Sequence, residues 1–373
     1  MKIGIDARFY GPIGGGGLGR YTKNLIDCLE KIDHQNEYVI FLRNENWENY
    51  NPSNHNFKKV LAPYKWYSFK EQLLMPIKIW KQKIDLMHFP HFNVPLLYPL
   101  IFKKEFVITI HDLILLKYPS KKATTLSPIY FRFKYLMYKL VISSAVKNAK
   151  KIIVPTKFVK YDILKYFKAP DNKIFVIYEG VTDMQNNNGF GVCGFNKNVD
   201  KKTDKEIKMC YNKRERETRE WSASWRNEKR EFQKVENGIA GHKYILYVGN
   251  AYPHKNLERL VDAFQLLVNV DYSVKLKKSG FGELALVLVG VKNYFYQQLI
   301  EYVKKNYPDL EHRIIFFGYA TDQELMHLYK KSELYVFLSL QEGFGLPPLE
   351  AMSYGVPVVS SKSSCLQEVL GDS

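Results

Sequence analysis

Residues 341–352 read Gln-Glu-Gly-Phe-Gly-Leu-Pro-Pro-Leu-Glu-Ala-Met, directly after an apolar run at 334–338 that predicts a strand. The two prolines suit the first turn of a helix, where a missing N–H costs little. The glycines let the backbone approach a ligand closely, and the free N–H groups of a helix start can hold phosphate or sugar hydroxyls. Glu342 precedes this turn and Glu350 lies inside the helix, so their carboxylates can address opposite ends of one elongated ligand. The alternative is a glycine-rich turn with a solvent-exposed Glu342.

The alternation of strand and helix extends along most of the chain. Strands are expected at 2–5, 38–42, 86–89, 106–110, 152–155, 174–178, 244–248, 284–289, 314–317, 334–338 and 357–360. Helices are expected at 20–32, 127–148, 157–167, 257–268, 294–306, 322–331 and 347–354. Strands that alternate with helices pair in parallel, so the sequence predicts α/β sheets whose ligands bind at the carboxyl ends of the strands.

Residues 184–238 interrupt this rhythm with a run dense in Lys, Arg and Glu. We predict two doubly wound, Rossmann-like domains, 1–183 and 239–373, which face each other across a cleft and are joined by this charged linker or insertion. Its later half is expected to form a solvated helix anchored by Trp221, Trp225 and Phe232. The helix expected from Leu366 onward has nothing after it, so we expect the second domain to be truncated.

Lysine and arginine outnumber aspartate and glutamate by 55 to 38, which gives a formal net charge of +17. This balance favours polyanionic partners, which include nucleic acid, anionic lipid headgroups and phosphorylated substrates. The sequence has neither zinc-finger spacing nor an aromatic RNA-recognition consensus, so we expect no nucleic-acid partner.

The four cysteines lie far apart and form no C-x-x-C pair, which fits a reducing cytoplasm better than a zinc knuckle or a disulfide framework. The N-terminus runs into a strand pattern without the apolar segment of a secretory signal. No apolar run approaches the ~20 residues that span a bilayer. We therefore expect a cytoplasmic protein, which lies on a membrane if it meets one.

Histidines occur after two of the expected strands. His111 follows the strand at 106–110, and a histidine at the carboxyl end of a strand faces the ligand side of the sheet. The alternative is a histidine that caps the local backbone. His88 and His91 have a spacing that suggests a metal, but the proline between them argues against a helix that presents both. We expect no metal site.

Two further stretches allow more than one interpretation. The six glycines from Gly11 to Gly19 do not form a dinucleotide fingerprint, because no acidic ribose ligand follows the strand at 38–42, and a flexible loop over a sugar phosphate fits better. Residues 130–140 mix aromatics with cations, and on a helix Phe131, Tyr135 and Tyr138 would share a face. Such a helix can lie in an anionic membrane interface. A helix packed on its own sheet, with its cations in water, is the preferred interpretation.

Glu342 and Glu350, with Gly-Phe-Gly-Leu-Pro between them, resemble the E-x7-E motif of retaining glycosyltransferases of the GT-B fold, sequence family 4, also called group 1 glycosyl transferases. The resemblance is to mannosyltransferase-like members and covers most of the chain outside the insertion. It includes Ile5-Asp6-Ala7-Arg8, Gly17-Leu18-Gly19-Arg20-Tyr21, Thr109-Ile110-His111-Asp112-Leu113, Glu179-Gly180-Val181, Tyr247-Val248-Gly249, Pro253-His254-Lys255-Asn256 and Phe317-Gly318-Tyr319.

The resemblance implies roles for individual residues in donor binding and catalysis. Glu350 would bind the ribose hydroxyls of the nucleotide, and Glu342 would contact the donor sugar near the anomeric centre. Lys255 would neutralise the diphosphate leaving group, although a solvated lysine at a helix start is the alternative. His111 would contact the transferred sugar near the reaction centre.

Glycines and backbone groups complete the implied site. The backbone of Gly343, Phe344, Gly345 and Leu346 would bind sugar hydroxyls and phosphate, and Gly318 would also line the donor site. Gly16 and Gly17 would let the N-terminal loop close over phosphate and acceptor. The N-terminal domain would thus serve the acceptor, and the C-terminal domain would bind the nucleotide sugar.

The residues that would neutralise the diphosphate differ in part from the family pattern. The sequence has no D-x-D motif, so Lys255 and the helix start must neutralise the leaving group, and metal-independent transfer without a cofactor is the expectation. Family members often carry Arg beside this lysine, whereas this chain has His254, which is only partly charged near neutral pH. His254 therefore replaces a full positive charge of the family pattern by a partial one at the second phosphate contact.

The sequence thus predicts a retaining hexosyltransferase, with mannose from GDP-mannose as the first guess. The acceptor would be a lipid-linked saccharide or a growing surface polysaccharide, handled in the bacterial cytoplasm at the inner face of the membrane. Two alternatives stay open. One is a truncated or inactive nucleotide-sugar-binding protein, and the other is a different GT-B enzyme such as a sugar-nucleotide epimerase or a phosphorylase.

Overall fold

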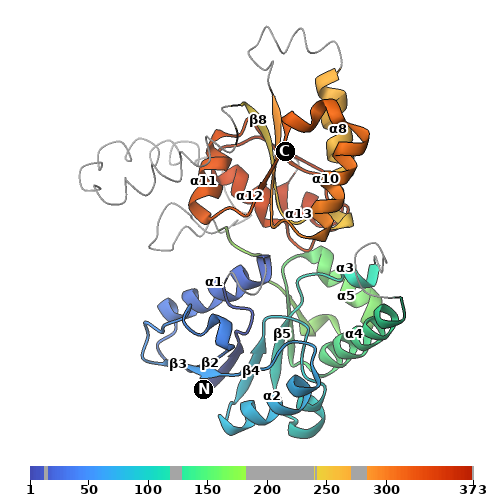
Figure 1. The fold of residues 1–373 in the computed structure, drawn as a ribbon. Helices are drawn as coiled ribbons and strands as arrows, with labels where there is room; N and C mark the ends of the chain where they lie inside the picture. The colour runs from blue at the N-terminus through green and yellow to red at the C-terminus, as the bar shows by residue number, and fades with distance from the viewer. Residues whose placement is uncertain (12–15, 118–127, 182–238, 240–241, 270–283, 372–373) are drawn as a thin grey trace, which may run out of the picture.

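A computed structural model of the chain describes residues 1–11, 16–117, 128–181, 239, 242–269 and 284–371. These residues form two α/β domains, one in each half of the chain (Figure 1). The expected insertion at 184–238, with its anchors Trp221, Trp225 and Phe232, lies outside the described residues. Among the helices that are described, none has the length and apolarity needed to cross a membrane.

The N-terminal domain contains a seven-stranded parallel sheet with the order β3-β2-β1-β4-β5-β6-β7. Its strands are β1 (Lys2–Asp6), β2 (Glu37–Leu42), β3 (Phe57–Leu61), β4 (Leu86–Phe89), β5 (Phe106–Thr109), β6 (Lys151–Val154) and β7 (Ile174–Val176). Its helices are α1 (Gly16–Ile32), α2 (Phe69–Lys81), the π-helix η3 (Tyr98–Phe102), α3 (Ile114–Lys117), α4 (Pro128–Asn148) and α5 (Lys157–Phe167), with the 3-10 turns η2 (Asn44–Asn46) and η5 (Asp171–Lys173).

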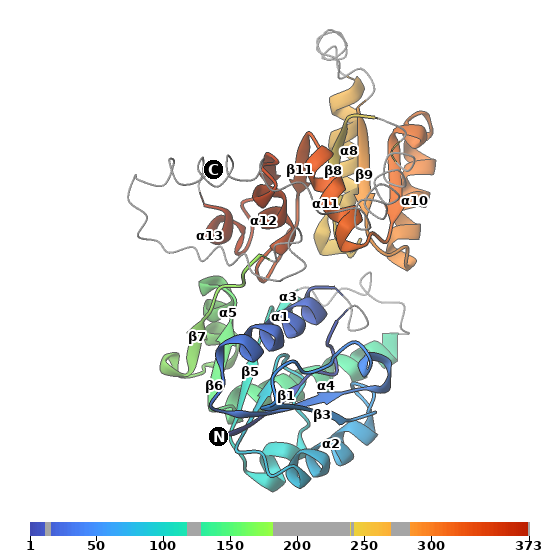
Figure 2. The same cartoon turned by 90° about the vertical axis from the view of Figure 1, so that its left-hand side faces the viewer.

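The helices of this domain cover both faces of the sheet. Ile26 of α1 packs with Ile5 and Ile40 on one face. Met75 of α2 and Ile142 of α4 belong to a second cluster, which covers the other face. Figure 2 shows α1 and α2 on opposite sides of the strands. The strand order changes direction between β1 and β4, which is the switch point where ligands of such sheets bind.

The C-terminal domain contains a five-stranded parallel sheet with the order β10-β9-β8-β11-β12. Its strands are β8 (Tyr244–Val248), β9 (Ala285–Val289), β10 (Ile314–Gly318), β11 (Leu334–Phe337) and β12 (Val358–Ser360). Its helices are α8 (Leu257–Asn269), α10 (Tyr294–Asn306), α11 (Asp322–Lys331), α12 (Leu346–Ser353) and α13 (Leu366–Leu370), with the 3-10 turns η7 (Pro253–Lys255) and η8 (Pro308–Arg313). Its switch point lies between β8 and β11.

Apolar patterning explains these elements. All residues of β9 are buried, as expected for a central parallel strand that is covered on both faces. The buried residues of α8 recur at intervals of three and four, which places them on one face of the helix: Leu257, Leu260, Val261, Phe264 and Val268.

The two-domain α/β architecture predicted from the sequence is confirmed. The expected helix at 20–32 begins earlier, at Gly16, so Gly16 and Gly17 form the first turn of α1 and not a free loop. The strand β3 and the helix α2 were not predicted. Pro76 inside α2 obscures the helical pattern, because proline is rare in a helix interior.

Candidate functional site

Lys255 and Glu342 form an ion pair at the switch point of the C-terminal sheet. Lys255 Nζ lies 2.6 Å from Glu342 Oε1, and both side chains are largely buried. The lysine ends η7, which follows β8, and the glutamate lies in the loop after β11. Leu340 N donates to His254 O over 2.8 Å and ties the two loops together. A buried cation and a buried anion thus lie side by side where ligands of such sheets bind.

The start of α12 has the geometry that its sequence predicts. Gly345 is the N-cap at φ +97°, a conformation that strains any side chain, and prolines occupy the first turn. The Phe344 carbonyl before it accepts a hydrogen bond from Cys365 Sγ over 3.3 Å. Leu346 begins the helix. Cys365 therefore holds the loop directly before the start of α12.

Gly343 brings the two domains into backbone contact. A Cβ at this position would lie 1.9 Å from the carbonyl oxygen of His111 in the N-terminal domain, so a larger residue cannot fit without separating the domains. Thr156 Oγ1, also in the N-terminal domain, donates to Gly343 O over 3.0 Å. The absence of a side chain at Gly343 therefore allows the two domains to come into contact, whether or not the same backbone also binds a ligand.

Glu350 is 3% exposed and is held from both domains. Its Oε2 accepts a hydrogen bond from Tyr329 OH over 3.0 Å, within the C-terminal domain. Its Oε1 lies 2.6 Å from Arg20 Nη1, which comes from α1 in the N-terminal domain. Arg20 Nη2 lies 2.6 Å from Asp322 Oδ1. One guanidinium therefore joins two carboxylates of the facing domain, a geometry that lysine cannot reproduce.

His111 is hydrogen-bonded through both ring nitrogens. Nδ1 lies 3.1 Å from Glu179 Oε1, and Nε2 lies 3.0 Å from Pro90 O. Burial lowers the pKa of His111, but the Glu179 carboxylate and the Pro90 carbonyl outweigh it and raise this pKa above its usual value. Two acceptors on two ring nitrogens suit the protonated ring, which donates from both. The structure therefore holds the His111 ring between two acceptors, while the backbone carbonyl of the same residue lies against Gly343.

The side chains of His88 and His91 have different hydrogen-bond partners. His88 Nε2 is hydrogen-bonded to Thr109 Oγ1 over 2.9 Å, and Asn93 N donates to His91 Nδ1 over 3.4 Å. Burial lowers the pKa of His88 to about 4 and that of His91 to about 3, so both rings are neutral near pH 7. Within the described ranges, no three His, Cys, Asp or Glu side chains gather to hold a metal ion.

His254 does not supply a second charge beside Lys255. Burial, together with the neighbouring ammonium of Lys255, lowers the pKa of His254 to about 4. Its ring stacks on Tyr252 at a centroid distance of 5.9 Å. Lys255 is therefore the cation that this turn offers at neutral pH.

The remaining predicted site glycines lie at strand and helix ends. Gly318 ends β10 at φ +91°, and its carbonyl accepts a hydrogen bond from Gly290 N over 2.9 Å. The strand β10 is separated from β8, which leads to Lys255, by β9. Gly16 and Gly17 begin α1, and a Cβ at either would meet nothing within 4 Å. The structure brings Lys255 together with Glu342 and the backbone of His111 together with Gly343, whereas Glu350 contacts Tyr329 and Arg20. The roles predicted for all the site residues stay predictions.

A second contact between the domains lies at the N-terminus of α5. The Glu368 carboxylate of α13 accepts hydrogen bonds from Lys157 N over 2.8 Å and from Phe158 N over 3.0 Å. It also accepts from Tyr178 OH over 2.8 Å. A carboxylate at a helix N-terminus satisfies free N–H groups and interacts favourably with the helix dipole. The C-terminal domain thus caps a helix of the N-terminal domain.

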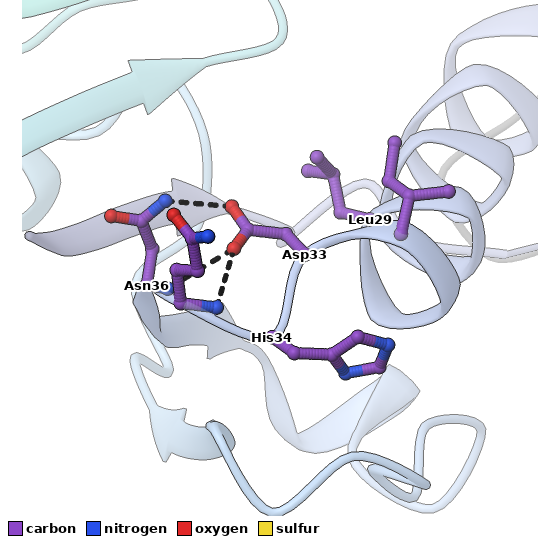
Figure 3. A pocket seen from close by; sticks show the side chains of 6 residues that line it. Leu29, Asp33, His34 and Asn36 are labelled. Atoms are coloured by element: carbon purple, nitrogen blue, oxygen red, sulfur yellow. Dashed lines mark hydrogen bonds between the residues drawn. The ribbon is translucent and has the colours of Figure 1, made fainter.

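A hollow of about 440 Å³ lies elsewhere, between the end of α1 and the start of β2 (Figure 3). Its Asp33 carboxylate accepts hydrogen bonds from Gln35 N and from Asn36 N and Nδ2. Because β2 begins here, this hollow is at the amino end of the strands, the edge opposite the ligand side. We therefore assign the Asp33 carboxylate a role in stabilising the turn between α1 and β2, and we assign the hollow no ligand.

Sequence reasoning assigned no role to several residues that the structure brings to the site. Arg20 and Glu179 stand inside the quoted motifs, yet neither was given a partner. Tyr329 and Glu368 lie outside those motifs. For Arg20 the available signal was its place at the start of the first expected helix, on the ligand side of the sheet.

Replacing Arg20 by alanine is expected to lower kcat about tenfold while the donor Kd stays unchanged or falls. The substitution removes the charge-assisted bridge between the domains, whereas Glu350 and Lys255 remain in the C-terminal domain. Lys23→Ala is the matched control, because Lys23 pairs with Asp27 inside α1. Steady-state kinetics and donor titration of both variants separate the two constants. A weaker donor Kd with unchanged kcat would contradict the bridging role.

The free energy of unfolding is expected to fall as the pH is lowered from about 7 to 5. His88 and His254 keep pKa values of about 4 when folded, whereas unfolded histidine titrates near pH 6.5. The unfolded chain then binds more protons, so this contribution is complete above about pH 6.5 and is lost as the pH falls. Urea titrations at several pH values measure the slope, which His88→Gln should reduce. The same change at the exposed His55 is the control, and equal slopes in both variants would contradict the prediction.

The chain matches two family models. The model described as "Glycosyltransferase Family 4" matches residues 15–184, and the model described as "Glycosyl transferases group 1" matches residues 229–373. Together they cover both domains. The solved structure of Anabaena HepE in complex with UDP-glucose has a TM-score of 0.60 and 18% identity, and the match covers 99% of this chain and 82% of that one. At this identity the likeness concerns the fold.

Two curated relatives are named mannosyltransferases. The O-antigen chain mannosyltransferase B of Escherichia coli is 37% identical over 36% of this chain and 32% of its own length. The O-antigen chain mannosyltransferase RfbU of Salmonella typhimurium is 25% identical over 85% of this chain and 67% of its own length. The chain thus spans about a third of the first relative and about two thirds of the second.

Proposed function

Because the chain belongs to the group 1 glycosyltransferases of family 4, with two Rossmann-like domains of the GT-B type, we propose that it transfers a hexose from a nucleoside diphosphate sugar to a saccharide acceptor with retention of configuration. The observation that carries this proposal is the largely buried Lys255–Glu342 ion pair at the carboxyl edge of the C-terminal sheet, followed along the chain by the buried Glu350 in α12. The lysine and first glutamate suit the sugar diphosphate, and Glu350, farther along, suits the ribose.

Charge at this site matches the charge that the reaction develops. Departure of a nucleoside diphosphate leaves negative charge on the phosphate and positive charge on the sugar. In our proposal Lys255 neutralises the phosphate, and the Glu342 carboxylate faces the sugar. Because His254 is neutral near pH 7, the lysine and the start of α12 carry the leaving-group charge without a metal.

His111 is proposed to position the transferred sugar. Its ring is held by Glu179 and the Pro90 carbonyl, and its own backbone carbonyl lies next to the backbone of Gly343. A sugar hydroxyl that replaces the Pro90 carbonyl as acceptor would receive a charge-assisted hydrogen bond from Nε2. The domain contact at Gly343 then sets the distance between this histidine and the donor.

The donor and acceptor are proposed from the relatives. Two of them are named O-antigen chain mannosyltransferases, which supports GDP-mannose as donor and a lipid-linked saccharide or a growing surface polysaccharide as acceptor. We place the reaction in the cytoplasm, at the inner face of the membrane. Since a structural neighbour was solved with UDP-glucose, UDP-sugars belong in any test.

A donor screen tests the proposal. The purified full chain is heated with GDP-mannose, UDP-glucose or an ADP-sugar, and a ligand that binds only the folded state raises the Tm. The stabilising donor is then incubated with a saccharide acceptor pool, with and without a chelator, and the anomeric configuration of the product is read by NMR. We expect chelator-insensitive transfer with retention. Stabilisation without any transfer would identify a binding protein, and interconversion of the donor sugar would identify an epimerase.

A further inference from the structure

The helix α2 is apolar on its outer side as well as on its inner side. Met75 and Ile79 face the core. Phe69, Leu73, Ile77 and Trp80 recur at intervals of three and four on the opposite side, and all are exposed, Phe69 to 83%. An apolar stripe on the solvent side of a surface helix is not needed for the core and calls for another partner.

The helix α4 repeats this pattern. Its C-terminal half packs on the sheet through Ile142, Ala145 and Val146, which are buried. Its outer side carries Ile129, Phe133, Leu136 and Leu140, all exposed, again at intervals of three and four. The sequence suggested a membrane-facing side at Phe131, Tyr135 and Tyr138 only as the alternative to a helix packed on its own sheet. Tyr138 contacts Phe92 at a centroid distance of 4.9 Å, so the exposed apolar side of α4 is a different one.

The two stripes belong to one side of the molecule. The inner residues of α2, η3 and α4 join a single core cluster on one face of the N-terminal sheet, so their outer sides point away from the same face. Trp80 of α2 contacts Phe102 of η3 at a centroid distance of 6.3 Å, and η3 adds the exposed Leu100 and Ile101. We call this the outer face of α2, η3 and α4.

The charge on this face has one sign. Residues 69–83, 98–104 and 128–148 contain ten lysines and arginines and one acid, Glu71. Glu71 is buried and paired with Arg8, so it does not reach the surface. The exposed cations include Lys70, Lys103, Arg132 and Lys139. Apolar side chains interleaved with cations are the pattern of interfacial helices on anionic lipid.

We propose that the outer face of α2, η3 and α4 docks on an anionic lipid bilayer, with Phe69, Trp80 and Phe133 entering the interface and the cations meeting headgroup phosphates. A second copy of the chain fits this face poorly, since a symmetric contact would oppose a cationic surface to itself. A bilayer supplies both the apolar layer and the negative charge over the whole face.

The docked face adjoins the site. Phe92, which contacts Tyr138 of α4, lies two residues after Pro90, whose carbonyl is hydrogen-bonded to His111. Glu71 in the first turn of α2 pairs with Arg8, which lies just after β1 at the carboxyl edge of the sheet. Docking would therefore hold this edge beside the lipid surface. The docking itself does not depend on the proposed function. Only its purpose does, which is to bring a lipid-linked acceptor to the N-terminal domain.

Vesicle binding of the full chain tests the inference. The protein is titrated with vesicles of phosphatidylcholine alone or mixed with phosphatidylglycerol at about 0.15 M salt. We expect binding to the mixed vesicles only. The variant Arg132→Gln/Lys134→Gln/Lys139→Gln should bind about 100-fold more weakly, since each cation near an anionic surface contributes about 1 kcal/mol, a factor of about five. The control Lys304→Gln/Lys305→Gln/Lys331→Gln, on the C-terminal domain, should bind as the unmodified chain does.

The apolar stripe is tested separately. Brominated lipid should quench tryptophan fluorescence in the unmodified chain and much less in Trp80→Phe. Leu73→Gln/Phe133→Gln should weaken binding, whereas Leu266→Gln, at an exposed leucine of α8, should not. Unchanged Tm values exclude misfolding. No binding, equal losses in the control variants, or retention by an acidic protein but not by vesicles would overturn the inference. Vesicle binding requires no donor, so vesicle-bound chain that transfers no sugar would overturn the proposed function alone.

Discussion

Replacing Glu350 by glutamine is expected to lower kcat/KM for the nucleotide sugar by about 100- to 1000-fold. The proposed contacts to ribose hydroxyls are charge-assisted, and each such hydrogen bond contributes about 1.5–3 kcal/mol. The carboxylate is 3% exposed, so solvent cannot replace it. Glutamine preserves the shape but removes the charge that holds Arg20, so domain closure weakens as well.

The measurement needs two readouts. Donor titration gives the loss in binding, and steady-state kinetics gives the total loss. Glu301→Gln is the matched control, since Glu301 is an exposed glutamate on α10 of the same domain. A Glu350→Gln variant that binds donor as well as the control does would remove Glu350 from the nucleotide site.

Replacing Lys255 by methionine is expected to lower kcat by about 100- to 1000-fold, the range found when one stabiliser of developing charge is removed. His254 is neutral near pH 7 and cannot compensate. The substitution also leaves the buried Glu342 carboxylate without its partner at 2.6 Å, which costs stability. The loss should fall on kcat more than on KM, because charge on the leaving phosphate is greatest in the transition state.

Two controls separate charge from packing. Lys255→Arg keeps the positive charge and should retain more activity than Lys255→Met. Lys304→Met removes a lysine of an exposed pair with Glu311 and should leave kcat unchanged. If Lys255→Met retained full kcat with a folded Tm, the leaving group would have to be neutralised by another residue.

Much of the fold follows from local pattern. The buried strand β9 reads as a short apolar run, and α8 shows its buried positions at helical spacing, so both were predicted nearly to the residue. The helix α2 was missed, because it is apolar on two sides and carries Pro76. A helix with two apolar sides has no single stripe for periodicity to detect.

The sequence predicted the site only where neighbouring residues along the chain form it. The motif from Glu342 to Glu350 encodes a turn and a helix start, and the structure has both. The partnership of Glu350 with Arg20 joins residues 330 positions apart, and no local rule specifies it. The charge state of His254 depends on burial by distant segments, which spacing along the chain does not reveal.

The long separations across the domain junction also set the order in which the molecule is assembled. Thr156 and Gly343 are 187 positions apart and Arg20 and Glu350 are 330 apart, so these contacts close very long loops. Domains fold as units, the N-terminal one first during synthesis. Each sheet can therefore complete its own core before the guanidinium and the carboxylate meet. A refolding chain should regain spectroscopic structure first and donor binding last, so the lag between the two reports the docking of the domains.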